Sequence, residues 1–267
     1  MTIRGSKRIG WIPLSLALLL LLGVIVVYIW AVIREDVRAW IPYISEAGGY
    51  PPESGVFGIF LFLGALLGLL TMTLRYFIVI EMTQRNNKII KILNILGLFN
   101  GLISIVGMVT VATYPVGFNS DDDNKSEWKK HILLPHTIGA FMLFIVGVIY
   151  TLLQTIVTYL MYPRHHGLTL FYVRLACGVL ALVSLITMMS AVPVENQTWV
   201  DDTNKNGTEN GEQTTGKRVS IAAEWLLAFF FISYFFTFYR EFQKISLSLE
   251  VEIHHFDQPS SLQNLST

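Results

Sequence analysis

Two ionisable side chains inside long apolar stretches are the residues of this chain best placed to do chemistry. His136 lies about one turn inside the stretch 132–160, and Glu224 lies about one turn inside the stretch 219–239. Ionisable groups are costly inside a bilayer, so those that occur there often serve ions, protons or ligands. We expect the two side chains at one depth, where they could pair with each other or surround an ion or a lipid headgroup. The structural alternative is that Glu224 favours the positive end of its own helix dipole and that His136 lies in the interfacial zone.

Signatures of enzymes are missing from the sequence. It contains no HExxH, GxSxG, phosphate-binding loop or dinucleotide fingerprint. The pairs His165-His166 and His254-His255 are adjacent in sequence, so a regular helix cannot turn both members toward one metal. The single cysteine, Cys177, excludes an intrachain disulfide. We therefore predict a protein that is not an enzyme and that has no catalytic residues, cofactor or metal site.

Six apolar stretches must position these side chains. Each is long enough for the roughly 20 apolar residues that cross a bilayer as a helix. Hydrophobic residues make up 53% of the chain and charged residues 14%, against about 25% charged residues in an ordinary soluble domain. The first stretch is too long for a cleaved signal sequence, so we interpret it as a retained anchor. The expected spans are 11–33, 55–80, 93–114, 132–160, 170–192 and 219–239.

These stretches predict an all-α integral membrane protein, with six transmembrane helices in one bundle. Residues 1–244 would form the transmembrane domain, and residues 245–267 a partly disordered tail. The segment after Lys244 is expected to prolong the last helix, although Ile245, Leu247 and Leu249 alternate rather than follow the helical period. We expect the first outward segment, 34–54, to fold back onto the bundle because it is too apolar to be freely solvated.

The distribution of charge predicts the orientation. The side that holds both termini carries eleven Lys and Arg against five Asp and Glu, and the other side carries eight against thirteen. Cytosolic loops are rich in Lys and Arg, so we expect both termini in the cytosol. Acceptor sequences for glycosylation at Asn124, Asn196 and Asn206 then fall in outward loops, where they can be modified. Asn264 lies in the cytosolic tail and is expected to stay unmodified.

Polar and small residues within the spans suggest how the helices pack. Arg75 and Arg174 lie near cytosolic ends, and we expect them to anchor there by extending to lipid phosphates. Asn94, Asn100 and Gln154 are expected to form hydrogen bonds between helices. Small residues let helix backbones approach closely in lipid, and this role is expected of Gly64, Gly68, Gly97, Gly101, Gly139, Gly147 and Gly178.

Seven motifs in order resemble the damage-regulated autophagy modulator (DRAM) family. They are PYISEAG (42–48), PPESGVFG (51–58), RY (75–76), HTIGA (136–140), YTLLQ (150–154), AAEW (222–225) and YREFQKIS (239–246). The resemblance covers nearly the whole chain and the same six spans. The outward loops 119–130 and 195–217 depart from the family pattern, because they are longer and more polar.

That resemblance implies a non-enzymatic, multi-pass protein of lysosomal membranes that promotes or regulates autophagy. The implied location extends to other endomembranes or the plasma membrane. The expected partners are membrane lipids and unknown proteins at the cytosolic face, with no nucleic acid. Two alternatives stay open: a lipid-handling protein, with His136 and Glu224 holding a headgroup, or a channel-associated subunit.

Overall fold

The computed structural model describes residues 5–37, 40, 42–83, 87–117, 125–164, 167–195 and 215–249. Six of its helices are long and apolar enough to cross a membrane, as the sequence predicts. The acceptor residues Asn124, Asn196, Asn206 and Asn264 lie outside the described residues. The spans are α1 (Trp11–Ile33), α3 (Glu53–Thr83), α4 (Lys88–Thr113), a composite fourth span, α8 (Leu168–Glu195) and α9 (Thr215–Phe236).

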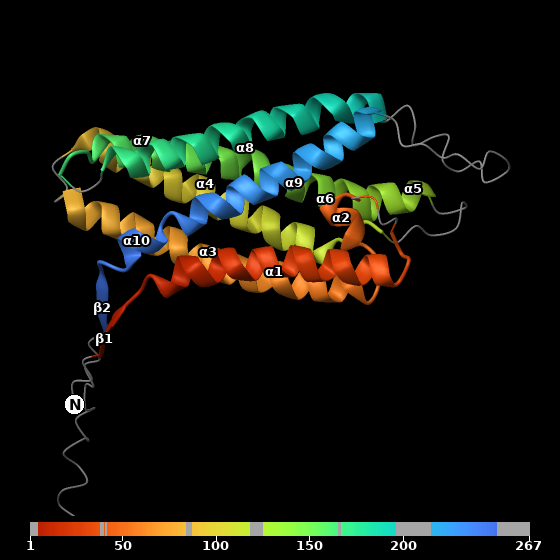
Figure 1. The fold of residues 1–267 in the computed structure, drawn as a ribbon, viewed down its shortest axis with the longest axis horizontal. Helices are drawn as coiled ribbons and strands as arrows, with labels where there is room; N and C mark the ends of the chain where they lie inside the picture. Colours follow the sequence, from red (N-terminus) through yellow and green to blue (C-terminus); the bar gives the residue numbers. More distant parts are fainter. Residues whose placement is uncertain are drawn as a thin grey trace, which may run out of the picture.

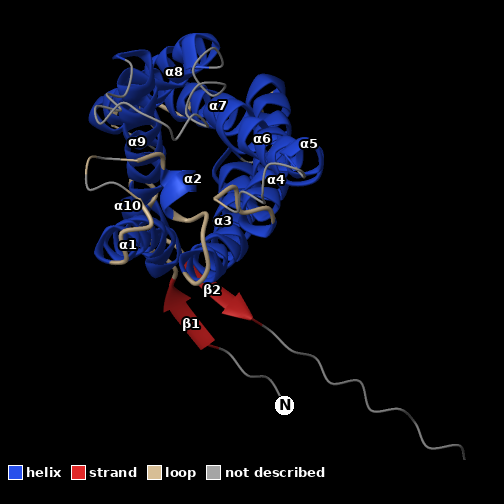
Figure 2. Ribbon diagram, turned by 90° about the vertical axis from the view of Figure 1, so that its right-hand side faces the viewer, coloured by secondary structure: helices blue, strands red, loops and turns tan. Residues whose placement is uncertain are grey.

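The spans form a closed ring of helices. In order around the ring, α1 contacts α3, α3 contacts α4, α4 contacts α7, α7 contacts α8, α8 contacts α9, and α9 returns to α1. Figure 1 shows the helices running lengthwise, and Figure 2 shows the ring from one end. A closed ring gives every span two neighbours, so each helix can satisfy its polar side chains inside the protein rather than in lipid.

The fourth span is interrupted by two π-helical segments. It comprises α5 (Lys125–Trp128), η2 (Lys129–Leu133), α6 (Leu134–Phe141), η3 (Met142–Val146) and α7 (Gly147–Leu160), in which η2 and η3 are π-helical. Wider turns of this kind leave backbone carbonyls free to bond elsewhere. Ser104 Oγ of α4 donates a hydrogen bond to the carbonyl of Leu143 at 3.0 Å, which satisfies one such group across the helix interface.

Glycine lets α4 approach the fourth span backbone to backbone. A Cβ atom on Gly107 would lie 2.5 Å from the amide nitrogen of Leu143 and 2.6 Å from the carbonyl oxygen of Gly139. The packing role expected of the other glycines is confirmed where an added Cβ would come closer than 3.0 Å to a neighbour. These positions are Gly64, Gly68, Gly97, Gly101, Gly139 and Gly147, whereas the nearest atom to a Cβ on Gly178 would be 3.3 Å away.

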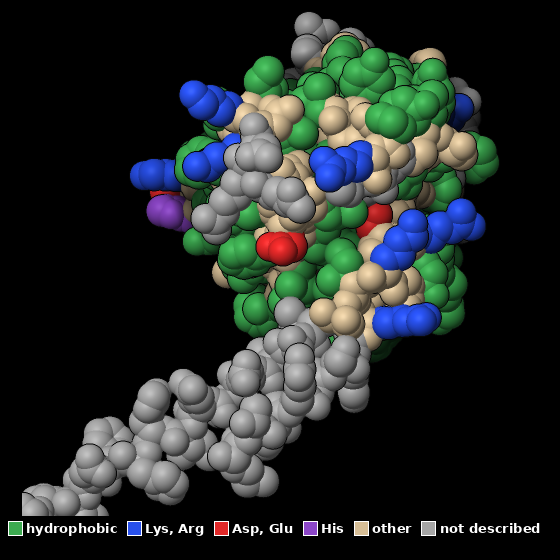
Figure 3. Space-filling view, turned by 90° about the vertical axis from the view of Figure 1, so that its left-hand side faces the viewer, with side chains coloured by type: hydrophobic (Ala, Val, Ile, Leu, Met, Phe, Trp, Pro, Cys, Tyr) green, Lys and Arg blue, Asp and Glu red, His purple; other side chains and the backbone are tan. Residues whose placement is uncertain are grey.

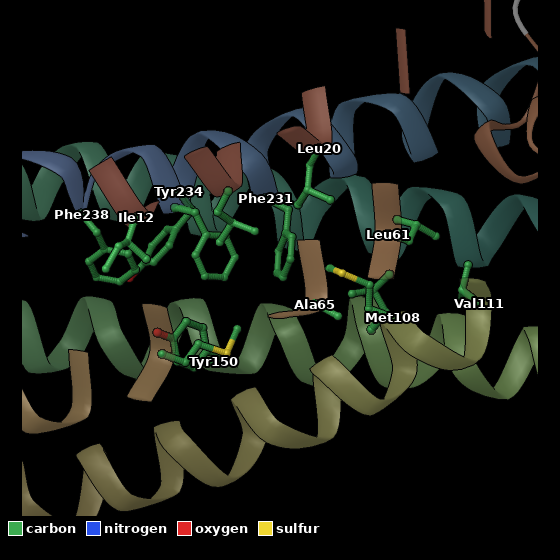
Figure 4. Packing of buried hydrophobic residues seen from close by; sticks show 14 of the residues in the cluster. Ile12, Leu20, Leu61, Ala65, Met108, Val111, Tyr150, Phe231, Tyr234 and Phe238 are labelled. Atoms are coloured by element: carbon green, nitrogen blue, oxygen red, sulfur yellow. The ribbon is translucent and has the colours of Figure 1, made fainter. Parts of the chain in front are cut away.

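Aromatic side chains fill the middle of the ring. Tyr150 of α7 stacks on Phe235 of α9, with 6.0 Å between ring centroids, and Phe231 meets Phe235 edge to face at 5.2 Å. Figure 4 shows Tyr150 below Phe231, Tyr234 and Phe238 in this layer. The fully buried rings of Tyr150 and Tyr234 close the interior of the bundle at this level.

The two ends of the bundle differ. One end carries the short helix α2 (Ile44–Ala47), which lies within the ring of helices in Figure 2, and we call it the cap end. The other carries α10 (Tyr239–Phe242) and an antiparallel pair of strands, β1 (Gly5–Arg8) and β2 (Ser246–Leu249), and we call it the ribbon end. The expectation that the segment after Lys244 prolongs the last helix is wrong. Its period-two pattern belongs to a strand whose backbone pairs with the start of the chain, Arg8 opposite Ser246.

Replacing Gly107 by alanine should destabilise the bundle. The new methyl group would meet the backbone of the fourth span, which cannot move aside as a flexible side chain could, so the cost should be about 1–3 kcal/mol. Thermal unfolding of the purified protein in detergent measures this change.

The matched control is Gly55→Ala, because nothing lies within 4 Å of a Cβ at that position. Alanine favours a helix over glycine, so the control should leave the unfolding temperature unchanged or raise it. An equal loss of stability in both variants would contradict the close approach at Gly107.

Candidate functional site: a capped cavity and a buried ion cluster

His136 and Glu224 line one small cavity beneath the cap. Both side chains are buried, at 7% and 8% exposure. They approach it from α6 and α9, and Ile44 of the cap lies beside them. The rest of the lining is mostly apolar, with Leu20, Phe57, Met108 and Phe231 among its residues. The structure therefore brings the two sequence-predicted residues to a shared depth.

Each of the two side chains is tied to backbone near the cap end. Glu224 Oε2 accepts a hydrogen bond from the Ile44 amide at 2.7 Å. His136 Nδ1 lies 2.7 Å from the carbonyl oxygen of Tyr114 at the end of α4, so this nitrogen carries the proton that is donated. Each residue thus satisfies one backbone group outside the long helices, the Ile44 amide or the Tyr114 carbonyl. The hydrocarbon of a bilayer could not form a hydrogen bond with these groups.

The described part of the segment between α1 and α3 folds back onto the bundle, as predicted. Besides the bond from Ile44 to Glu224, Trp225 Nε1 donates to the carbonyl of Pro42 at 2.8 Å. The indole of Trp225 also meets the ring of Tyr28 edge to face, at 5.5 Å between centroids. Glu53 begins α3 fully buried, with a carboxylate oxygen 3.0 Å from Arg34 Nε. Together these contacts hold the segment between α1 and α3 against α9.

The size of the cavity limits what it can hold. Its volume is about 80 Å³, enough for a few water molecules. Binding pockets for small organic ligands are usually about 300–1,000 Å³. A lipid headgroup therefore does not fit between His136 and Glu224 in this conformation, and attachment of the cap is the role that the geometry favours.

A second polar site, at the ribbon end, was missed by sequence reasoning. Glu241 of α10 lies between Arg75 of α3 and Arg174 of α8, and both arginines are fully buried. Arg75 Nη1 donates to Glu241 Oε1 at 2.8 Å, and Arg174 Nη2 donates to Glu241 Oε2. One carboxylate thus joins three helices through two ion pairs.

Neutral side chains complete this ion cluster. Arg75 Nε donates to Gln154 Oε1 of α7 at 3.2 Å, and Arg174 donates to Thr158 and Thr237. The ring of Phe238 lies 4.4 Å from the guanidinium carbon of Arg174 and 5.4 Å from that of Arg75. Cations over an aromatic face are stabilised by the ring's negative quadrupole, which lowers the cost of burying two positive groups beside one negative group.

A break in the last span places Glu241 inside the bundle. Between α9 and α10 the amides of Thr237 and Phe238 bond to carbonyls three residues back, those of Tyr234 and Phe235, rather than four. Tighter turns of this type rotate the side chains that follow. The break therefore brings Glu241 and Phe238 to the arginines, while Arg240 stays exposed.

The expectation that Arg75 and Arg174 extend to lipid phosphates is wrong, because Glu241 and its neighbours hold both inside the ring. The signal was present in the sequence as two arginines and one glutamate near the same-side ends of three spans. The expected interhelical bonds form at Gln154 and at Asn94, whose Nδ2 donates to the Tyr76 carbonyl at 2.9 Å. Asn100 instead bonds within its own helix, to the Leu96 carbonyl.

Among the described residues, neither site has the arrangement of a metal centre. Within the described part of the chain, no group of three His, Cys, Asp or Glu residues could hold a metal ion. In both sites, buried polar side chains hold together the helices and loops at their own end of the bundle. They define a class of protein, a six-span helical bundle of the membrane with internally paired charges.

Comparison with known proteins identifies the family. Residues 8–245 match the family described as the Frag1/DRAM/Sfk1/Cwh43P N-terminal domain, and the chain belongs to this family. It is 33% identical to the mouse DNA damage-regulated autophagy modulator protein 2 over 93% of this chain and 89% of that protein. It is 31% identical to the human DNA damage-regulated autophagy modulator protein 1 over 93% and 97%. A frog relative, the modulator of macroautophagy TMEM150B of Xenopus tropicalis, is 31% identical over 67% and 70%. No solved structure matches the chain.

Removing the charge of Glu241 should destabilise the protein strongly. Glu241→Gln would leave Arg75 and Arg174 buried without a counter-charge, and breaking such a pair costs about 3–5 kcal/mol. The unfolding temperature of the purified protein measures the loss. Glu81→Gln is the control, because Glu81 is exposed near the same end and its substitution should change stability by less than about 0.5 kcal/mol. Equal stability of the two variants would show that the cluster does not hold the helices.

Replacing Glu224 by alanine should loosen the cap. The Ile44 amide would lose its acceptor, so hydrogen exchange over residues 42–49 should accelerate about tenfold, as expected for a lost bond of ~1–2 kcal/mol. Glu224→Gln keeps a side-chain oxygen and should preserve most of the protection. Exchange that is as slow in the alanine variant as in the wild type would exclude a cap-holding role for Glu224.

Proposed function

We propose that this protein is a non-enzymatic membrane protein that regulates autophagy. The observation that carries the proposal is the match over 93% of the chain to relatives named as DNA damage-regulated autophagy modulators. The buried polar residues support a role without catalysis, because the described contacts of His136, Glu224 and Glu241 hold the helices and the segment around α2 in place.

The proposed location is the lysosomal membrane or a related endomembrane, with both termini in the cytosol. The charge distribution supports this orientation. At the ribbon end, the exposed charged side chains are mostly basic: Arg8, Lys88, Lys91, Arg164, Arg240 and Lys244, beside Glu81. Figure 3 shows Lys and Arg spread over this end. In this orientation the basic face meets the cytosol, where it can recruit protein partners, and the outward loops carry Asn124, Asn196 and Asn206.

The two alternative functions receive less support. A channel-associated subunit needs a path for ions, whereas buried aromatic rings from α7 and α9 fill the middle of the bundle. A lipid-handling role at His136 and Glu224 needs a pocket several times larger than the cavity beneath the cap.

The experiment is deletion of the gene followed by rescue with tagged protein. Deletion should lower autophagic flux, measured as the turnover of autophagosome cargo with and without a block of lysosomal degradation. Tagged wild-type protein should restore this flux and should be found in lysosomal membranes. The variant Lys88→Glu with Lys91→Glu reverses two exposed charges at the ribbon end and should rescue poorly, because partners would meet the wrong charge.

The matched control reverses two exposed charges at the other end of the bundle, Lys129→Glu with Lys130→Glu, and should rescue fully. A protein that stays at the plasma membrane and whose loss leaves flux unchanged would refute the proposed function. Equal rescue by both double variants would refute recruitment through the basic face.

A further inference from the structure

A basic groove lies at the ribbon end, apart from the ion cluster and the capped cavity. Arg8, Arg240 and Lys244 line it, and the remaining lining comes from Tyr239, Gln243 and the first residues of the ribbon. Its volume is about 500 Å³, and the described residues that line it include three cations and no acidic side chain. An open space of this size and charge suits a polar, negatively charged group.

The neighbouring acid does not neutralise the groove. Glu241 follows Arg240 directly in sequence, but both of its carboxylate oxygens are engaged inside the bundle by Arg75 and Arg174. Two guanidinium groups outweigh this one carboxylate, so the ion cluster behind α10 is itself net positive. Its field adds to that of the three exposed cations rather than opposing it.

The groove is built on joined backbone rather than on a free tail. The Ile9 amide donates to the Ile245 carbonyl at 3.4 Å, and the strands pair beyond this point. Gly10 packs directly on Gln243, so closely that a Cβ atom there would lie 2.5 Å from Gln243 Cγ. The segments on the two sides of the groove, before α1 and after α10, therefore hold each other in place.

Aromatic side chains place the groove at the depth of lipid headgroups. Trp11 begins α1 half exposed, three residues after Arg8, and Tyr159, Tyr162 and Tyr172 are also exposed near the ribbon end. Trp and Tyr favour the interface between hydrocarbon and water. A groove at this same end of the bundle is therefore expected at the level of the phosphates of the adjacent leaflet, whichever compartment the ribbon end faces.

We infer that this groove binds the phosphorylated headgroup of an anionic membrane lipid, with Arg8, Arg240 and Lys244 as its ligands. Each cation near a membrane surface adds about one order of magnitude or less to the affinity for an anionic lipid. The inference does not depend on the proposed role in autophagy, because binding can be measured on the purified protein alone.

The test is calorimetric titration of the purified full chain in detergent with dioctanoyl phosphatidylinositol 4-phosphate. Binding should be saturable, and Arg240→Gln with Lys244→Gln should weaken it about 30-fold. The matched control is Lys88→Gln with Lys91→Gln, which removes the same charge from exposed positions on α4 at the same end and should change the affinity less than about threefold. Both variants alter exposed side chains, and equal unfolding temperatures will show that both are folded.

Other outcomes decide against the inference. No binding of the lipid, or the same loss of affinity in both double variants, would show that the groove is not a site. Dioctanoyl phosphatidylcholine that binds as tightly would show that the negative headgroup is not recognised. Inorganic phosphate that displaces the lipid at equal concentration would assign the groove to free phosphate instead of a lipid.

Discussion

The structure depends on a single carboxylate that is shared by two buried arginines. A bilayer offers no water to a charged group, so Arg75 and Arg174 can lie inside the ring only because Glu241 meets both of them. Since these residues come from α3, α8 and α10, and Gln154 adds α7, the pairing fixes spans that are far apart in sequence. The break after α9 and the ring of Phe238 also help to accommodate the two buried arginines, because the break positions Glu241 and the ring stacks on their guanidinium groups.

At the cap end, too, buried polar groups need partners from the protein, but here most of them are uncharged backbone groups. There the backbone around α2 leaves the helical pattern, and its polar atoms need partners from the bundle. Glu224 and Trp225 provide two of them, and His136 provides one for the end of α4. Residues that look like a reactive pair in sequence are thus engaged in closing the bundle, and the small cavity between them is what remains after the cap has packed.

The two ends therefore suit different roles. The cap end is tied down and nearly filled, which leaves little space for a ligand. The ribbon end is mostly basic, and the carboxylate of Glu241 there is turned inward to Arg75 and Arg174, whereas Glu81 is exposed.

The sequence by itself determined the class of protein. Six apolar stretches of bilayer length admit only helices, because an unpaired backbone is too costly in lipid. The ordered motifs alone also indicated the family to which the chain belongs. The sequence also located the polar residues of the spans, and it predicted that glycines at positions such as Gly64 and Gly101 would be contact points between helices.

Only the tertiary structure decided which polar residues meet. Hydropathy reports the depth of a residue along its own helix but not its direction around that helix. From the sequence, Arg75 and Arg174 could therefore have faced either lipid phosphates or Glu241 inside the bundle. The strand after Lys244 likewise needed the start of the chain beside it, since two paired strands form only when both are present. The depth of a residue in the membrane is a local property that the apolar stretches of the sequence encode. The pairing of polar side chains depends instead on how the ring of helices closes, and that closure results from contacts between residues distant in sequence.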